Sequence, residues 1–300
     1  MNEDKLISII LPVYNGADYL SMSIDSILYQ TYKNWELIIV NDCSIDDTLS
    51  IAKEYEKRDS RIKVVSNEKN LRLPMTLNRG FEEASGYYYT WTSHDNIYKP
   101  DALKKMKDVL EENISYAMVY ADYTYIDDSG KRTGEMKNAE PENIVRGNMV
   151  GACFLYTAEI AKKIGNYDQN LFLAEDYDYW IRIYLNGKLK HLSESLYYYR
   201  RHSKSLTETK KALVNMQTYK VLEKNFLPLY KVAKQNNMEN FLFDQMLERV
   251  NPAYKEETKR MLLCVNSRYD SYLKRRSFHR KLSNSFCGKT YRALKGMIRK

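Results

Sequence analysis

Two acidic side chains of this sequence follow apolar runs, where a carboxylate can meet a ligand. Asp42 comes directly after WELIIVN, and its carboxylate could accept a hydrogen bond from a base N–H such as uracil N3. Asp95 stands in WTSHDN. A divalent cation that bridges a diphosphate needs only one or two such carboxylates, because phosphate oxygens and waters complete its shell. Each residue also has a structural interpretation, Asp42 as a turn or helix cap and Asp95 as part of a turn.

A further acidic pair opens the segment AEDYDYW. Asp176 falls in the first turn of an expected helix, where a carboxylate complements the helix dipole and needs no other role. A carboxylate within about 3 Å of a hydroxyl can also take its proton as a general base. Glu175 is the alternative base, and the residue types do not separate the two.

Histidine and cysteine give weaker signals. His202, in YYYRRHSKS, has no second histidine at ligand spacing. It is therefore either a surface or supporting residue or a contributor to a donor or metal site. The four cysteines (Cys43, Cys153, Cys264 and Cys287) form no CxxC pair. This scatter argues against a disulfide framework or a zinc site and is typical of a reducing cytosol.

The hydrophobic pattern predicts an α/β scaffold for these residues. Strands are expected at 6–14, 35–41, 61–67 and 87–93, with helical periodicity after each of them. Such alternation predicts βαβ units and a largely parallel sheet. Further strands are expected at 116–127, 150–156 and 195–200, with a helix from about Glu175 to a stop at Gly187. Beyond about 205 the sequence is mostly helical, so we place a domain boundary there.

In a parallel α/β sheet, ligands bind outside the carboxyl ends of the strands. Three of these ends carry polar residues, at Tyr14-Asn15, at Asn41-Asp42 and at Ser93-His94-Asp95. The second half of the chain adds Glu175-Asp176 at a helix start. The sequence therefore predicts a binding and catalytic site at this edge.

Length and charge restrict the class of protein. Three hundred residues suit one large domain, or one α/β domain with an appendage. No run approaches the roughly 18 apolar residues of a membrane span. The N-terminal MNEDKLISIILPVY predicts a strand and not a signal peptide. These features indicate a soluble, cytoplasmic protein. The net charge is +8, and since 271–300 contribute +10, the first 270 residues sum to −2.

The basic tail at 271–300 has two interpretations. Its bases alternate with Leu, Phe, Tyr, Met and Ile, as in helices that lie on an anionic membrane, which would place the protein peripherally on the inner face of the cell membrane. The alternative is a solvated helical extension or a frayed end. Nucleic acid is not expected as a partner, because no nucleic-acid motif accompanies the charge.

Three stretches together are typical of a known family. They are ISIILPVYNGADYLSMSIDSILYQTYKNWELIIVNDCSIDDT, LNRGFEEASGYYYTWTSHDNIYKPDAL and AEDYDYWIRI. In this order the sequence resembles the inverting family 2 glycosyltransferases of the GT-A fold, over roughly 5–205. The resemblance implies a Rossmann-like nucleotide-binding α/β/α sandwich with a mostly parallel mixed sheet at 1–205. A helical, basic extension would follow at 206–300.

The resemblance also implies roles for individual positions. The turn from Pro12 through Tyr14 to Asn15 would hold the nucleoside together with Asp42, and Arg72 falls where some relatives keep an arginine and others a glycine. Ser93-His94-Asp95 matches the acidic DxD motif with serine in place of the first acid, which leaves Asp95 as the carboxylate for Mn²⁺ or Mg²⁺. His94 would lie at the nucleotide and His202 at the metal. Asp176 matches the catalytic base, and 151–153 would line the acceptor side.

The function implied is inverting transfer of a sugar from a nucleotide sugar to a growing cell-surface glycan such as a polysaccharide, a capsule or a lipid-linked oligosaccharide. UDP is the expected nucleotide of the donor. Asp176 would deprotonate the acceptor hydroxyl. A metal on Asp95 would offset charge on the departing nucleoside diphosphate. Loss of the first motif acid keeps open a non-catalytic relative that binds nucleotide or glycan. A third hypothesis, an RNA- or membrane-binding adaptor, requires the placement of Asp42, Asp95 and Asp176 to be coincidental.

Overall fold

The computed structural model describes residues 5–203 and 205–274. Its first half is a parallel sheet, in the order β3-β2-β1-β4. The strands are β1 (Ile7–Val13), β2 (Trp35–Asn41), β3 (Ile62–Ser66) and β4 (Tyr88–Trp91). In β1 all seven residues are buried, as the continuous apolar run predicts for a central strand covered on both faces.

The same nine-stranded sheet continues from β4 through β8, β6, β9 and β5, with β7 paired to β6. These strands are β5 (Ile97–Tyr98), β6 (Tyr116–Ile126), β7 (Arg132–Met136), β8 (Phe154–Thr157) and β9 (Lys188–Arg200). Here β6 and β9 are parallel, whereas β8, β7 and β5 pair antiparallel with their neighbours. The expected mixed sheet is confirmed, with its continuous parallel part in the first half.

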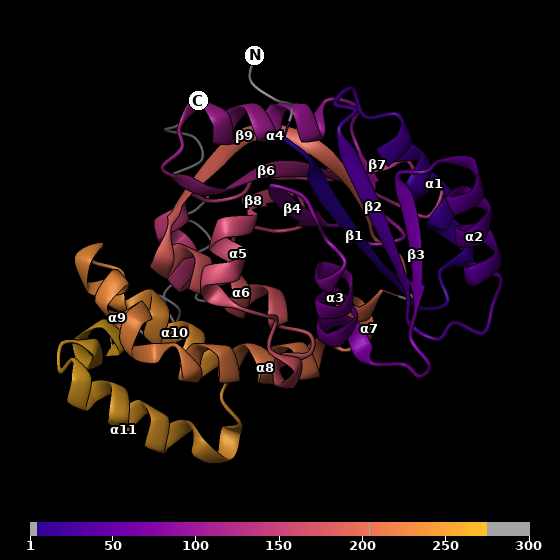
Figure 1. The fold of residues 1–300 in the computed structure, drawn as a ribbon. Helices are drawn as coiled ribbons and strands as arrows, with labels where there is room; N and C mark the ends of the chain where they lie inside the picture. The colour runs from indigo at the N-terminus through magenta and orange to yellow at the C-terminus, as the bar shows by residue number, and fades with distance from the viewer. Residues whose placement is uncertain (1–4, 204, 275–300) are drawn as a thin grey trace, which may run out of the picture.

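Helices cover both faces of the sheet (Figure 1). One face packs on α1 (Ala17–Leu28), α2 (Thr48–Arg58) and α4 (Ala102–Glu112). The other packs on α3 (Arg72–Glu82), α5 (Ala158–Ile164) and α6 (Glu175–Asn186). Alternate residues of β1 pack on opposite faces of the sheet. Ile9 and Leu11 belong to the hydrophobic cluster with α1, α2 and α4, and Ile10 belongs to the cluster with α3, α5 and α6.

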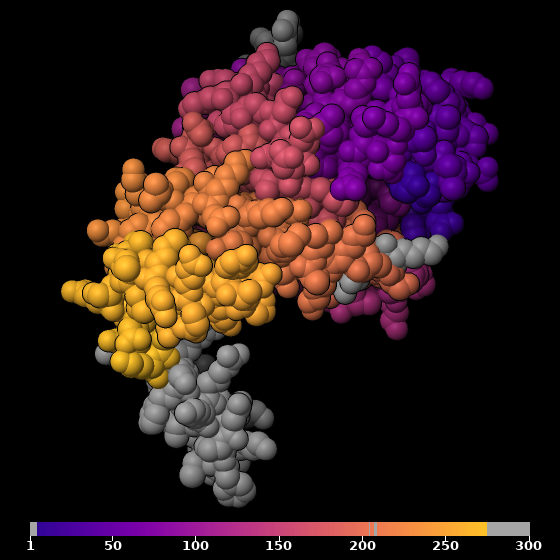
Figure 2. Space-filling view, turned by 90° about the horizontal axis from the view of Figure 1, so that it is seen from below, coloured from indigo at the N-terminus to yellow at the C-terminus, as the bar shows by residue number. Residues whose placement is uncertain are grey.

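The chain after β9 is helical. It contains α7 (Leu206–Thr209), α8 (Lys211–Lys224), α9 (Phe226–Gln235), α10 (Glu239–Arg249) and α11 (Lys255–Val265). This part of the chain also contains the short 3-10 helix η3 (Pro252–Tyr254). Two other 3-10 helices, η1 (Pro141–Arg146) and η2 (Gln169–Leu171), come earlier in the chain, before α6. In Figure 2 the orange helices lie between the yellow end of the described chain and the pink second half of the sheet domain.

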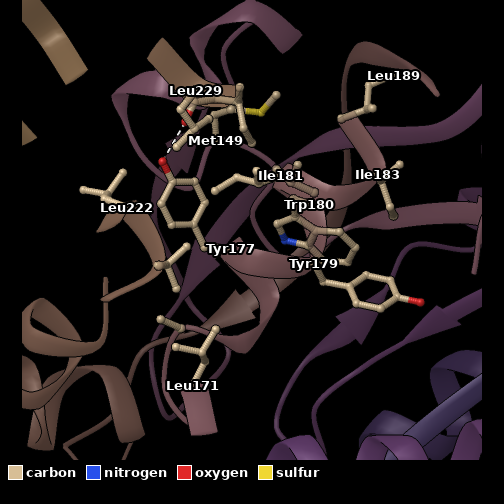
Figure 3. Close-up of a cluster of buried hydrophobic side chains, with 14 of the residues drawn as sticks. Met149, Leu171, Tyr177, Tyr179, Trp180, Ile181, Ile183, Leu189, Leu222 and Leu229 are labelled. Carbon is tan, nitrogen blue, oxygen red and sulfur yellow. Dashed lines mark hydrogen bonds between the residues drawn. The ribbon is translucent and has the colours of Figure 1, made fainter. Parts of the chain in front are cut away.

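The helical extension shares a core with α6. Leu222 of α8 and Leu229 of α9 are fully buried in the same cluster as Tyr177 and Trp180 (Figure 3). Buried Asp178 of α6 also accepts a hydrogen bond from Asn225 Nδ2 at 3.1 Å. The extension therefore packs against the helix that carries the predicted base. Most of the basic tail, 275–300, lies outside the described residues.

Two expected features differ from the structure. The strand predicted at 150–156 begins only at Phe154, because Gly151 has a φ of +69° and carries the chain into a turn against Tyr123. Gly187 does follow α6, but its φ is −159° and it needs no left-handed freedom. A Cβ at Gly187 would lie 2.5 Å from the Ala117 Cβ, so close packing requires glycine there.

Within residues 5–203 and 205–274, no helix has the length and apolar character that crossing a membrane requires.

Candidate active site

The carboxyl ends of β1, β2 and β4 meet at one edge of the sheet. The Asp42 N–H donates to the Val13 carbonyl at 2.8 Å, and the Thr92 N–H donates to the Ile10 carbonyl at 2.9 Å. Parallel pairing thus brings the segments that start at Tyr14, Asp42 and Ser93 to the same edge, as the sequence predicts.

The loop after β1 is tied to the loop after β2. Asn15 donates its backbone N–H to Ser44 Oγ at 2.9 Å, and its side-chain oxygen accepts from the Ile45 N–H at 2.9 Å. Asn15 adopts a φ of +51°, which asparagine tolerates better than most residues. Pro12 is buried within β1, whereas Tyr14, just after the carboxyl end of β1, is 47% exposed. Of these residues, Tyr14 and Asn15 are exposed.

Asp42 is buried and caps α3. Its Oδ1 accepts from Asn67 Nδ2 at 2.9 Å and from the Leu71 N–H at 2.7 Å, while Oδ2 accepts from the Arg72 N–H at 3.0 Å. The structural interpretation places the cap on the next turn or helix, whereas these contacts are with the start of α3, 30 positions along the chain. A carboxylate has about four acceptor positions, so one remains on Oδ2 after these three bonds. Contact with a nucleobase stays a prediction.

Arg72 begins α3 with strained backbone. Its φ of +67° lies in the left-handed region that favours glycine, and Asp42 holds this conformation through the Arg72 N–H. The guanidinium lies over the Phe172 ring, 5.6 Å from its centroid. This places the side chain between the carboxyl edge of the sheet and the turn before α6. Glycine would adopt this backbone conformation at a lower free-energy cost than arginine. The strain at Arg72 therefore suggests that its side chain, and not its backbone, is what the site uses.

His94 packs closely against the first loop. A Cβ at Gly16 would come within 2.5 Å of His94 Cδ2, so glycine leaves room for the ring. Burial lowers the pKa of His94, so the imidazole is neutral near pH 7. His94 is thus a neutral, confined group beside Gly16.

Asp95 has one paired and one unpaired carboxylate oxygen. Oδ2 lies 2.9 Å from His202 Nε2, whereas Oδ1 is buried and has no hydrogen-bond partner in the part of the chain that the structure describes. A buried, unpaired carboxylate oxygen is costly unless a ligand completes it. The structure therefore brings Asp95 and His202, far apart in sequence, to one point and leaves one oxygen available.

The expected divalent cation fits these residues. Among residues 5–203 and 205–274, no group of three or more His, Cys, Asp or Glu side chains could hold a metal ion. A cation at Asp95 must therefore take most of its ligands from a substrate and from water, as Mg²⁺ does in diphosphate sites. The orphaned Oδ1 is the oxygen that such a cation would bind.

Asp95 is also held by a chain of contacts that the sequence did not predict, through Arg200, Tyr19 and Asp128. Fully buried Arg200 donates through Nε to the Asp95 carbonyl at 3.1 Å, and its guanidinium lies 4.7 Å from the centroid of the Tyr19 ring. The Tyr19 hydroxyl donates to Asp128 Oδ1 at 2.7 Å, and the same ring contacts His202. The only sequence signal for this support was the adjacent RRH segment.

The acidic pair on α6 forms a second group. Glu175 is buried, and its Oε2 accepts from the Leu173 N–H at 2.6 Å. Asp176 is half-buried, and its Oδ1 and Oδ2 each accept one bond of 2.7 Å, from the Tyr177 N–H and from Asn148 Nδ2. Asn148 was not anticipated, because nothing marks it within an irregular segment.

Both acids have pKa values above the ordinary range. Burial, and then the charge of Asp176, raises the pKa of Glu175 to about 8, so Glu175 is mostly protonated at pH 7. Burial also raises the pKa of Asp176, against the lowering effect of the Tyr177 N–H and Asn148. A raised pKa makes an ionised carboxylate a better proton acceptor near neutral pH.

Residues with strained backbone conformations are concentrated near the predicted site residues. Five non-glycine residues have positive φ in the described chain, and four of them (Asn15, Cys43, Arg72 and Leu173) adjoin the predicted site residues. Leu173, with a φ of +78°, is fixed by the side chain of Glu175. Such strain persists only where surrounding structure enforces it, and it concentrates at functional sites.

The fold and the position of these residues define a class of protein: a glycosyltransferase of the GT-A type. The sequence model described as "Glycosyl transferase family 2" matches residues 8–171. The chain belongs to this family. An uncharacterized glycosyltransferase of Rickettsia prowazekii (strain Madrid E) is 31% identical over 236 residues, which cover 74% of this chain and 71% of that protein.

Two solved structures share the fold. S. aureus TarS 1-349 in complex with UDP-GlcNAc superimposes with a TM-score of 0.67 at 17% identity, over 88% of this chain and 83% of that one. The mannosyltransferase PcManGT from Pyrobaculum calidifontis, in complex with GDP-Man and Mn²⁺, gives a TM-score of 0.64 at 14% identity, over 98% of this chain and 85% of that one. At these identities the likeness establishes the fold alone.

Proposed function

We propose that this chain transfers a sugar from a nucleotide sugar, UDP-linked, to a hydroxyl of a growing cell-surface glycan, with inversion at the anomeric carbon. The observation that carries the proposal is the carboxylate of Asp95, at the edge where ligands bind in a parallel α/β sheet. One of its oxygens is held by His202, and the other has no hydrogen-bond partner among the described residues. TarS with UDP-GlcNAc and PcManGT with GDP-Man support the donor class.

The donor would lie along the carboxyl edge. In this proposal the nucleoside contacts the turn at Pro12, Tyr14 and Asn15, and Asp42 contacts the base through its remaining acceptor position. Arg72 extends a guanidinium from the start of α3, where it can pair with the nucleotide's anionic groups. Asp42 also fixes the start of α3 and so sets the position of this arginine.

Asp95 would bind a divalent cation at the diphosphate, with His202 beside it on Oδ2; the ion would be Mn²⁺ by likeness to PcManGT, with Mg²⁺ as the alternative. Bound there, the ion supplies Lewis-acid stabilisation of the charge on the leaving nucleoside diphosphate. The chain's own contribution is to hold Asp95 through Arg200 and His202, which leaves Oδ1 without a hydrogen-bond partner among the described residues.

Asp176 would take the proton of the acceptor hydroxyl as the new bond forms. Its two oxygens are fixed by Asn148 and by the Tyr177 N–H, which orients the carboxylate before the acceptor arrives. Glu175 is mostly neutral at pH 7 and engaged with the Leu173 N–H, so it is the weaker candidate. A base and a leaving group on opposite faces of the sugar give inversion without a second carboxylate nucleophile.

A mixture of donor, Mn²⁺ and protein tests the proposal. UDP-, GDP- and dTDP-sugars, each with and without Mn²⁺, should be compared by thermal shift and by release of the nucleoside diphosphate. We expect stabilisation by the matching donor with Mn²⁺, by about 2.7 kcal/mol at one hundred times the Kd, together with slow release through hydrolysis. Stabilisation without any release, with a panel of glycan acceptors also present, would favour the non-catalytic alternative.

We also propose that the basic tail holds the protein on an anionic membrane, where a lipid-linked acceptor would be available. Deleting 275–300 removes nine Lys and Arg residues but keeps the Tyr272 hydroxyl on Asp244 at 2.7 Å. Each base near an anionic surface contributes about 1 kcal/mol at low salt. The partition coefficient of the protein onto phosphatidylglycerol vesicles, measured by co-sedimentation, should therefore fall more than about tenfold. Turnover on a soluble acceptor should persist. Equal sedimentation of both proteins would exclude the tail as the anchor.

A further inference from the structure

Asn148 lies between η1 and β8 and contacts the predicted base directly. Its Nδ2 is 2.7 Å from Asp176 Oδ2. An ionised carboxylate only accepts hydrogen bonds, so the amide must present its nitrogen and not its oxygen. With the Tyr177 N–H on Oδ1, each carboxylate oxygen of Asp176 has one protein donor and keeps lone pairs for a hydroxyl.

The backbone on the C-terminal side of Asn148 is anchored to the sheet. Asn138 Nδ2 donates to the Val150 carbonyl at 3.0 Å and to the Ala121 carbonyl of β6 at 2.8 Å. Gly151, next along the chain, packs so closely on Tyr123 that a Cβ would come within 2.4 Å of the ring. This part of the segment therefore has little freedom to shift.

On the N-terminal side, the same segment is anchored to α6 and to the helical extension. The Tyr177 hydroxyl donates to the Ile144 carbonyl at 2.7 Å, the contact dashed in Figure 3. The guanidinium of Arg146 lies over the Phe241 ring of α10, 3.9 Å from its centroid. The exposed amide of Asn148 is thus presented to Asp176 by backbone that is fixed on both sides.

Few other charges act on the Asp176 carboxylate. Glu175 precedes it on α6, and Tyr167, from the segment before η2, is the other titratable group whose pKa its charge raises. The nearby cation Arg146 is directed onto Phe241. Asn148 is therefore the only side-chain donor to Asp176 among residues 5–203 and 205–274.

We infer that Asn148 is a positioning residue of this enzyme, which orients the Asp176 carboxylate toward the acceptor and favours its ionised form. The inference rests on the proposed function, in which Asp176 takes the proton. Asn148 would thus affect the reaction at the acceptor hydroxyl indirectly, through its contact with Asp176. It also gives the segment between η1 and β8 a role in catalysis.

Asn148→Ala and Asn148→Asp test the inference. Because Asn148 is exposed, both variants should fold, with melting temperatures close to wild type. In Asn148→Ala the pKa of Asp176 should rise, because a donor to its charged form is lost. The acid limb of the kcat profile should move to higher pH, with kcat about five- to tenfold lower on that limb and largely recovered on its alkaline side. Donor KM should be unchanged. Asn148→Asp should move the limb further in the same direction, since it adds a like charge.

A double variant separates this inference from the proposed function. If Asn148 acts through Asp176, adding Asn148→Ala to Asp176→Asn should cost no further activity. An additive loss in the double variant would mean that Asn148 acts through another group, and the inference would be wrong while the base assignment stands. Wild-type rates in Asn148→Ala would also overturn it. Wild-type rates in Asp176→Asn would instead overturn the base assignment, and this inference with it.

Discussion

Replacing Asp95 by alanine is expected to weaken Mn²⁺-dependent donor binding by more than about 100-fold, with the fold retained. Residues that merely support a metal ligand already cost 10–100-fold in affinity when removed, so loss of the ligand itself should exceed that range. The buried Oδ1 of Asp95 has no hydrogen-bond partner within residues 5–203 and 205–274, so the substitution removes a desolvated oxygen without breaking a hydrogen bond of those residues on that side. Calorimetry with UDP-sugar, titrated with and without Mn²⁺, measures the effect.

His202→Ala provides a graded comparison. It removes the group 2.9 Å from Asp95 Oδ2 but leaves the carboxylate, so a loss of about 10–100-fold is expected. Asp108→Ala is the matched control, because this carboxylate pairs with Lys104 on the outer surface of α4 and should bind metal and donor like wild type. Wild-type Mn²⁺ dependence in Asp95→Ala would show that the cation is held elsewhere.

The fold was predictable where hydrophobic periodicity is strong. The run WELIIVN corresponds to β2 (Trp35–Asn41), because a fully buried strand has apolar residues on both faces and polar residues just beyond it. Strand β7 was missed because four of its five residues are exposed, which leaves no apolar pattern to detect. Strand β5 was missed because two residues are too few for a pattern.

The positions of the acidic residues were predictable, but their partners were not. A parallel sheet places Asp42 and Asp95 at one edge by topology alone. The contact of Asp95 with His202 joins residues 107 positions apart, and that of Asp176 with Asn148 joins residues 28 apart. Such contacts depend on how loops pack, for which neither periodicity nor spacing carries a signal. The strained φ at Leu173 is likewise a product of tertiary packing and not of local sequence.

Asp176→Asn tests the mechanism itself and should lower kcat by about 10²–10⁴-fold, the usual contribution of general-base catalysis. Asparagine keeps the size of the side chain and can still accept from the Tyr177 N–H. The Asn148 amide can rotate to offer its oxygen to the new NH₂ group, so the local hydrogen bonds survive. Donor affinity and melting temperature should therefore stay close to wild type. Single-turnover rates with saturating acceptor separate the chemical step from product release.

Glu175→Gln is the matched variant one residue away, with its side chain about 100° around the helix. Since burial raises the pKa of Glu175 to about 8, glutamine resembles the protonated form present at pH 7. Its amide oxygen can still accept from the Leu173 N–H and hold the strained turn. We therefore expect less than about tenfold loss of kcat, well below the 10²–10⁴-fold loss of general-base catalysis. A large loss here with a small one in Asp176→Asn would transfer the base to Glu175. Rates near wild type in both variants would mean that neither carboxylate takes the proton, because removing an essential base cannot leave the chemical step unchanged.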